Sequence, residues 1–165
     1  MQGGGHGART AAFAVLAALV AAAPCSAASV QITGLQDAAF TSLDPLVDAT
    51  RAQSICVFSN TVTRGYNVTA RGSGAASAFT LSAGGSSPTL PYTVQWSPTA
   101  GSTSGTALAV GATLIGQKST ATNTACKTGV TASASLILIL RTSDLQAALS
   151  GVSYSGTLSL TIAPE

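Results

Sequence analysis

Residues 133–141, Ser-Ala-Ser-Leu-Ile-Leu-Ile-Leu-Arg, predict a β-strand that is apolar on both faces. The aliphatic run from Leu136 to Leu140 alternates leucine with isoleucine, and successive side chains of a strand point to opposite faces. A strand of this kind must be covered on both sides. It therefore lies either in the middle of a sandwich or beside a cleft that another element fills.

Shorter runs on both sides of this stretch predict further strands, separated by clusters of turn residues. The last run alternates, with Leu158, Leu160 and Ile162 on one face and hydroxyl side chains on the other, which is typical of a sheet with one solvated face. In chain order, the predicted strands are residues 30–34, 38–43, 54–58, 66–71, 78–82, 92–96, 133–141 and 156–162.

These strands predict an all-β fold, an immunoglobulin-like antiparallel β-sandwich, with a small barrel as the alternative. One short helix is expected over residues 144–149, with Ser143 as its N-cap and Gly151 after its end. Charged residues make up 7% and hydrophobic residues 46% of the 165-residue chain, a composition that favours a packed domain over a disordered one.

The first residues of the chain have the pattern of an export signal. No acidic residue precedes Arg9, and residues 10–23 form an apolar run. Small residues follow and allow a cut after Ala27 or after Ala28. The run is shorter than the roughly 20 residues that cross a bilayer, so a signal peptide is favoured over a membrane anchor. Lipidation of Cys25 is a further alternative, which the proline before it disfavours.

We therefore expect a signal peptide over residues 1–28, one β-sandwich domain over residues 29–165 and no membrane span in the mature chain.

Loss of Cys25 with the leader leaves Cys56 and Cys126, which predict one disulfide bond in an oxidising compartment, with two buried free thiols as the alternative. The mature chain keeps six of the seven basic residues against five acidic ones, a balance that indicates no nucleic-acid partner.

Residues that carry chemistry are scarce in the mature chain. The single histidine, His6, lies in the leader, so a serine or cysteine nucleophile would have no histidine base. Asp44 and Asp48 lie on either side of Pro45 and are expected to be solvated turn residues instead of a catalytic pair. No segment has the spacing of a zinc or calcium site. We predict no catalytic residue, no cofactor and no metal site, and we expect that the protein is not an enzyme.

Tyr92, Val94 and Trp96 share one face of their predicted strand, as core residues of a sandwich do. The alternative is an exposed aromatic platform of Trp96, Tyr92 and Tyr66 that contacts a sugar. Such a platform would make the protein a self-contained glycan-binding or surface-binding module.

Residues 40–46, Phe-Thr-Ser-Leu-Asp-Pro-Leu, match four positions of a Phe-Gly-x-Tyr-Asp-Pro-Leu stretch, and in this they resemble the spore coat protein U domain. Further similar segments, in the order of that family, are Cys56, the tyrosine-containing strand 66–70, the glycine turn 72–74, the Leu-x-Tyr strand 90–94 and the final Tyr-Ser-x-Thr strand 153–162, which is shared with fimbrial subunits. The resemblance covers most of residues 30–162.

The resemblance implies a structural or adhesive subunit of the archaic chaperone-usher pilus type, secreted through the periplasm to the cell surface or a fimbrium. Such a subunit is an incomplete sandwich, assembled by strand addition: a periplasmic chaperone and then a neighbouring fibre subunit supply the missing strand. The expected partners are the chaperone, the usher and other subunits. The residues expected to form the groove for strand exchange are Leu136, Leu138, Leu140, Leu158, Leu160 and Ile162.

Overall fold

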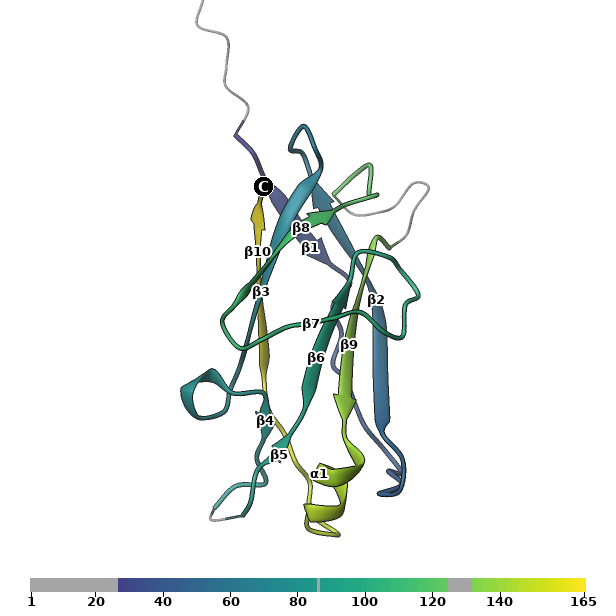
Figure 1. The fold of residues 1–165 in the computed structure, drawn as a ribbon, viewed down its shortest axis with the longest axis vertical. Coiled ribbons are helices and arrows are strands. Elements are labelled where there is room, and N and C mark those ends of the chain that lie inside the picture. Colours follow the sequence, from purple (N-terminus) through teal and green to yellow (C-terminus); the bar gives the residue numbers. More distant parts are fainter. Residues whose placement is uncertain (1–26, 86, 125–131) are drawn as a thin grey trace, which may run out of the picture.

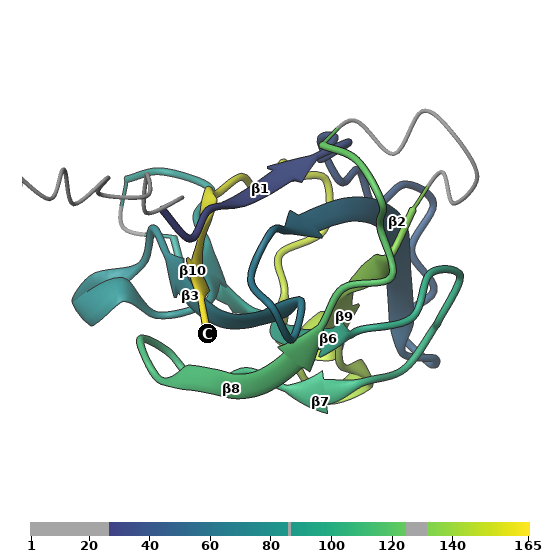
Figure 2. The same ribbon diagram turned by 90° about the horizontal axis from the view of Figure 1, so that it is seen from above.

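The computed structural model describes residues 27–85, 87–124 and 132–165. Two antiparallel sheets pack against each other (Figures 1 and 2). The larger sheet contains, in spatial order, β1 (Val30–Thr33), β2 (Ala49–Ser59), β9 (Ala134–Leu140), β6 (Thr93–Ser97) and β7 (Thr106–Ala107). The smaller sheet contains β10 (Leu158–Pro164), β3 (Gly65–Gly72) and β8 (Thr113–Lys118). The remaining elements are the ribbon of β4 (Thr80–Leu81) and β5 (Leu90–Pro91), the 3-10 turn η1 (Ala75–Ser77) and the helix α1 (Thr142–Ala147).

The predicted all-β antiparallel sandwich is confirmed. The predicted strands 30–34, 66–71 and 133–141 agree with β1, β3 and β9 to within one residue at each end. The predicted strand 54–58 is one part of the longer β2. Residues 38–43 form no strand, so that prediction was wrong, and the strands β7 and β8 were missed.

The strand β9 lies between β2 and β6, in the middle of the larger sheet. Leu136 belongs to the main core between the sheets, and Ile137 is fully buried on the opposite face. The loop after β6 is held on that opposite face, because the Ser135 hydroxyl donates to the Thr99 carbonyl (2.9 Å) and accepts from the Ser102 amide (3.1 Å). The prediction that both faces of this strand are covered is confirmed.

Trp96 and Tyr66 form the centre of the core, and neither is exposed. Their rings meet edge to face with centroids 6.2 Å apart, and Trp96 Nε1 donates to the Tyr66 hydroxyl at 3.3 Å. Burial raises the pKa of Tyr66, because the charged phenolate would lose its hydration. Tyr92 is half-buried and packs on the Phe79 ring at 5.7 Å. The core interpretation of Trp96 is therefore confirmed, and the aromatic platform is wrong.

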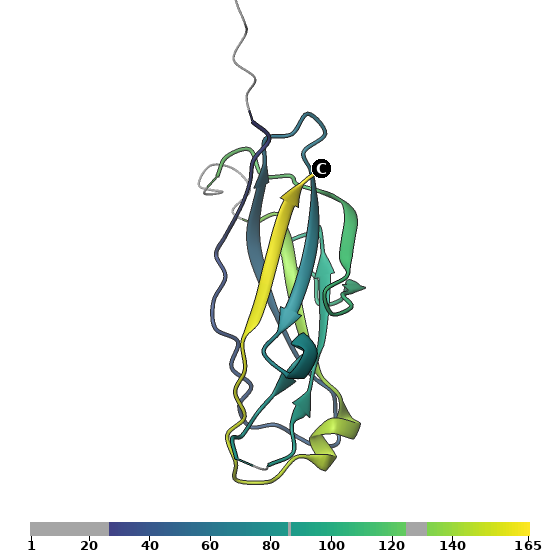
Figure 3. The ribbon, with the colours of Figure 1, turned by 90° about the vertical axis from the view of Figure 1, so that its left-hand side faces the viewer.

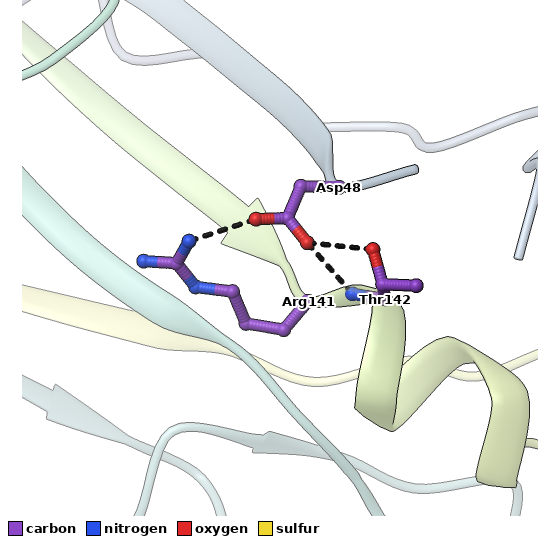
Figure 4. Close-up of polar contacts among 3 residues, drawn as sticks. All are labelled: Asp48, Arg141 and Thr142. Atoms are coloured by element: carbon purple, nitrogen blue, oxygen red, sulfur yellow. Dashed lines mark hydrogen bonds and ion pairs between the residues drawn. The ribbon is translucent and has the colours of Figure 1, made fainter. Parts of the chain in front are cut away.

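The carboxylate of Asp48 fixes the first turn of α1 (Figure 4). One oxygen accepts from the Thr142 amide (2.7 Å) and the Thr142 hydroxyl (2.9 Å), and the other pairs with the Arg141 guanidinium (2.7 Å). The predicted cap, Ser143, lies inside the helix instead. A carboxylate from a segment distant in sequence takes its place, because it bonds an amide that the helix leaves unpaired.

Protonation of Asp48 is expected to loosen this contact. The hydrogen bonds from Thr142 and Arg141 lower the pKa of Asp48 from 3.8 to about 2. Because the pKa is lower in the folded state, the contribution to stability is present above about pH 4 and is lost as the pH falls through about 2. The Asp48→Asn variant should therefore lose less unfolding free energy than the wild type over this window. Urea unfolding at a series of pH values measures the difference, and parallel profiles would contradict it.

Cys56 is buried in β2, where it packs with Ala121 and Phe58. Cys126 lies outside the described residues, so the bond between Cys56 and Cys126 stays a prediction. Mass spectrometry of the exported protein should detect a gain of two hydrogen atoms on reduction, because a disulfide takes up one hydrogen per sulfur. The Cys56→Ser variant is the control and should gain none in the monomer. A wild-type mass that reduction does not change would contradict the bond.

Candidate functional site

A groove with a volume of about 740 Å³ opens between the two sheets, and residues 35–43 and 152–160 form most of its two walls. Leu136, Leu138 and Leu140 of β9 form its floor. Figure 3 shows β10 in yellow, with the chain that follows β1 running along the same side of the molecule in dark blue. Of the described residues that line the groove, only Asp37 is charged. Such a lining suits an uncharged, extended ligand.

One wall is an extended stretch, residues 35–41, which we call the wall segment. The strand β1 pairs with β2 only between Cys56 and Ser59. Gly34 then adopts a φ of +84°, a left-handed conformation that favours glycine, and here the pairing with β2 ends. No residue of the wall segment pairs with a strand in the described ranges. The strand predicted over residues 38–43 therefore fails because its backbone has no ladder partner.

The other wall includes the first part of β10. This strand pairs with β3 over seven residues, from Leu158 opposite Gly72 to Pro164 opposite Tyr66. Its second edge has no strand partner in the part of the chain that the structure describes. Leu158 and Leu160 point inward and remain half-buried, because the groove lies over them. The unpaired edge offers backbone donors and acceptors to an added strand.

The sheet edges at β7 and β8 are less suited to an added strand. The strand β7 is only two residues long. The pairing of β8 with β3 shifts register between Tyr66 and Val68, and Gly116 within β8 has a φ of +74°. The Gly116 amide is also occupied, since it donates to the Glu165 carboxylate at 3.0 Å. Short strands and bulges protect an edge from pairing, so β10 presents the longer regular edge.

The residues predicted for strand exchange come from two different strands, and the fold brings most of them together. Five of the six line the groove: Leu136, Leu138, Leu140, Leu158 and Leu160. Ile162 packs against the main core, as Leu158 and Leu160 do, but it does not line the groove. The sequence prediction missed groove residues outside these strands, among them Leu35, Phe40, Leu81, Leu90 and Tyr154. Phe40, Leu90 and Tyr154 lie in three of the family-like motifs, the one signal that could have found them.

Asp44 and Asp48 lie outside the groove lining, and both have structural contacts. Asp44 accepts a hydrogen bond from the Leu46 amide (2.9 Å) within a turn, and Asp48 holds α1. Within residues 27–85, 87–124 and 132–165, no group of three or more histidine, cysteine, aspartate or glutamate side chains could hold a metal ion. In these same ranges, no helix has the length and hydropathy to cross a membrane. What the described residues present at the groove is an apolar lining and the unpaired edge of β10.

Comparison with known proteins gives a fold relationship. No family model and no curated protein matches the chain. A similar solved structure is a chain from a chaperone–tip adhesin complex of CFA/I fimbriae biogenesis, with a TM-score of 0.55 and 15% sequence identity. The match covers 82% of this chain and 41% of that chain, so this protein spans less than half of its neighbour's length. This protein therefore shares its fold with part of a chain from that chaperone–tip adhesin complex.

Proposed function

We propose that this protein is a secreted structural subunit of a fimbrial-type surface fibre or coat, assembled by strand addition. The observation that carries the proposal is the groove, which has a leucine floor and lies beside the free edge of β10. The ligand that fits both features is an extended peptide. Its backbone would bond the strand edge, and its side chains would fill the apolar groove.

An added strand would complete the sandwich along the groove. Every second side chain of that strand would face floor residues such as Leu136 and Leu138, because strand side chains alternate. The wall segment, seven residues long, could flank an extended peptide of about 23 Å, at roughly 3.3 Å per residue. Covering the half-buried leucines would favour binding by about 25 cal/mol per Å² of apolar surface removed from water.

The partners that fit this groove are a periplasmic chaperone, which would supply the strand first, and a neighbouring subunit, which would replace it in the fibre with the help of an usher. The fold neighbour supports this assignment, since it comes from a chaperone–tip adhesin complex. The motifs at residues 40–46 and 153–162 support it through their resemblance to the spore coat protein U domain. Export by the signal peptide over residues 1–28, most of which lies outside the described residues, would lead to the cell surface.

The proposal assigns no catalytic role and no cofactor. The mature chain has no histidine to act as a base, since His6 precedes both predicted cleavage points. The glycan-binding alternative has lost its platform, because Trp96 and Tyr66 are fully buried. Binding of a peptide strand in the groove is therefore better supported than binding of a glycan.

Export of the full-length protein into the periplasm of a Gram-negative host tests the proposal. The protein is produced alone and, in parallel, with the pilus-type chaperones encoded in its own genome. We expect low recovery or self-association without a chaperone, because the groove stays unfilled, and a soluble one-to-one complex with one. Affinity capture followed by native mass spectrometry measures the complex. A stable monomer that binds none of these chaperones would contradict the proposal.

A further inference from the structure

We propose that Gln53 and Arg51 are positioning residues, which hold the wall segment beside β2 and so keep the groove open for a strand. Both side chains come from the part of β2 whose backbone pairs with β9 on its other side. The inference rests on the proposed function only in its last step, the entry of a strand. The first step of the inference, the position of the wall segment, is argued from contacts within this chain alone.

Two hydrogen bonds tie the wall segment to β2, and both use a side chain of β2. The Gln53 side-chain oxygen accepts from the Gln36 amide at 3.0 Å. The Arg51 Nε donates to the Ala39 carbonyl at 2.8 Å. The backbone of the wall segment therefore lies about one side-chain length from the edge of β2. A backbone ladder would bring the two closer together.

The wall segment is bounded by two residues with left-handed backbone, Gly34 (φ +84°) and Ser42 (φ +53°). Near its far end, Phe40 packs with a second core cluster that includes Leu90 and Leu140. The residues between these points are exposed, including Leu35 at 44%. Apart from the Phe40 ring, the two side-chain tethers are thus the main restraint on this segment.

The tethers oppose a movement that the hydrophobic effect favours. Leu138 and Leu160 in the groove are only half-buried, and an inward shift of the wall segment would cover them. Holding the segment back leaves these leucines accessible to an incoming strand. A preformed groove lowers the ordering cost of binding. Because both tethers are exposed, each is individually weak, and the wall can still adjust when a strand enters.

Hydrogen exchange of the exported full-length product tests the first step. The variants are Gln53→Ala, Arg51→Ala and the double variant, with Gln31→Ala and Arg71→Ala as matched controls from exposed positions on β1 and β3. We expect the Gln36 amide, which donates to Gln53, to exchange about threefold faster in each single variant and about tenfold faster in the double variant. Gln53→Glu keeps an acceptor oxygen and should exchange like the wild type. Exchange in the tether variants that equals that of the controls would overturn the proposal.

Strand entry is measured on the same proteins with a fluorescent peptide of about ten residues, in which valine and threonine alternate between lysine ends. We expect the double variant to bind it at least about threefold more slowly, with an unchanged thermal midpoint, and Gln53→Glu to bind at the wild-type rate. Equal association rates in wild type and double variant would overturn the positioning role. If the wild type binds no peptide while exchange still depends on the tethers, the proposed function fails and the positioning of the wall segment stands.

Discussion

Replacing Leu138 by glutamate is expected to abolish strand addition, with a loss of affinity for a bound strand of at least about 100-fold. Leu138 is half-buried in the groove floor, in the middle of β9. In the free protein, a glutamate at this position reaches the water in the groove, so the fold should tolerate it. Once a strand covers the floor, the same carboxylate is buried without a partner, and this costs several kcal/mol.

The strand peptide or the chaperone complex measures this effect, and two variants control it. Leu138→Met keeps an apolar side chain of similar volume and should bind nearly as well as the wild type. Ile115→Glu adds the same charge to β8, at an exposed position outside the groove, and should not affect binding. Full binding by the Leu138→Glu variant would show that the strand does not lie on this floor.

Truncation of Trp96 to alanine is expected to lower the free energy of unfolding by about 3 to 5 kcal/mol. Its indole is fully buried between the sheets, and its loss would leave a cavity and remove the donor to the Tyr66 hydroxyl. Trp96→Phe keeps an aromatic ring and should cost less. Urea unfolding followed by far-ultraviolet circular dichroism measures both variants, because the tryptophan signal disappears with the side chain. A loss below about 1 kcal/mol in Trp96→Ala would contradict the central place of this residue in the core.

Side-chain patterns were sufficient to predict β9 and β10, because in these strands the pattern itself decides burial. The doubly apolar run in β9 needs cover on both faces and has it. The alternation of Leu158, Leu160 and Ile162 places these three residues on the inner face of β10. Together with the family-like motifs, these patterns were enough to name five of the groove residues.

Local patterns could not predict features that depend on distant contacts. The wall segment resembles a strand in composition, but the left-handed turn at Gly34 ends the pairing with β2, and side chains of Gln53 and Arg51 bond its backbone in place of a ladder. The missed strand β8 has a bulge at Gly116 that breaks its alternation and leaves Ile115 exposed. The cap of α1 comes from Asp48, 94 residues before Thr142. Sequence rules for helix caps consider only residues next to the start of the helix, so they could not identify it.

We expect an incoming strand to add to the free edge of β10, and hydrogen exchange at β10 tests this claim. The exchange of residues 158–164 is compared in the free protein and in its complex with the chaperone or the strand peptide. We predict that the β10 amides that do not donate to β3 exchange at least about tenfold more slowly in the complex, because they then donate to the added strand. Unchanged exchange at these amides in a saturated complex would contradict the claim.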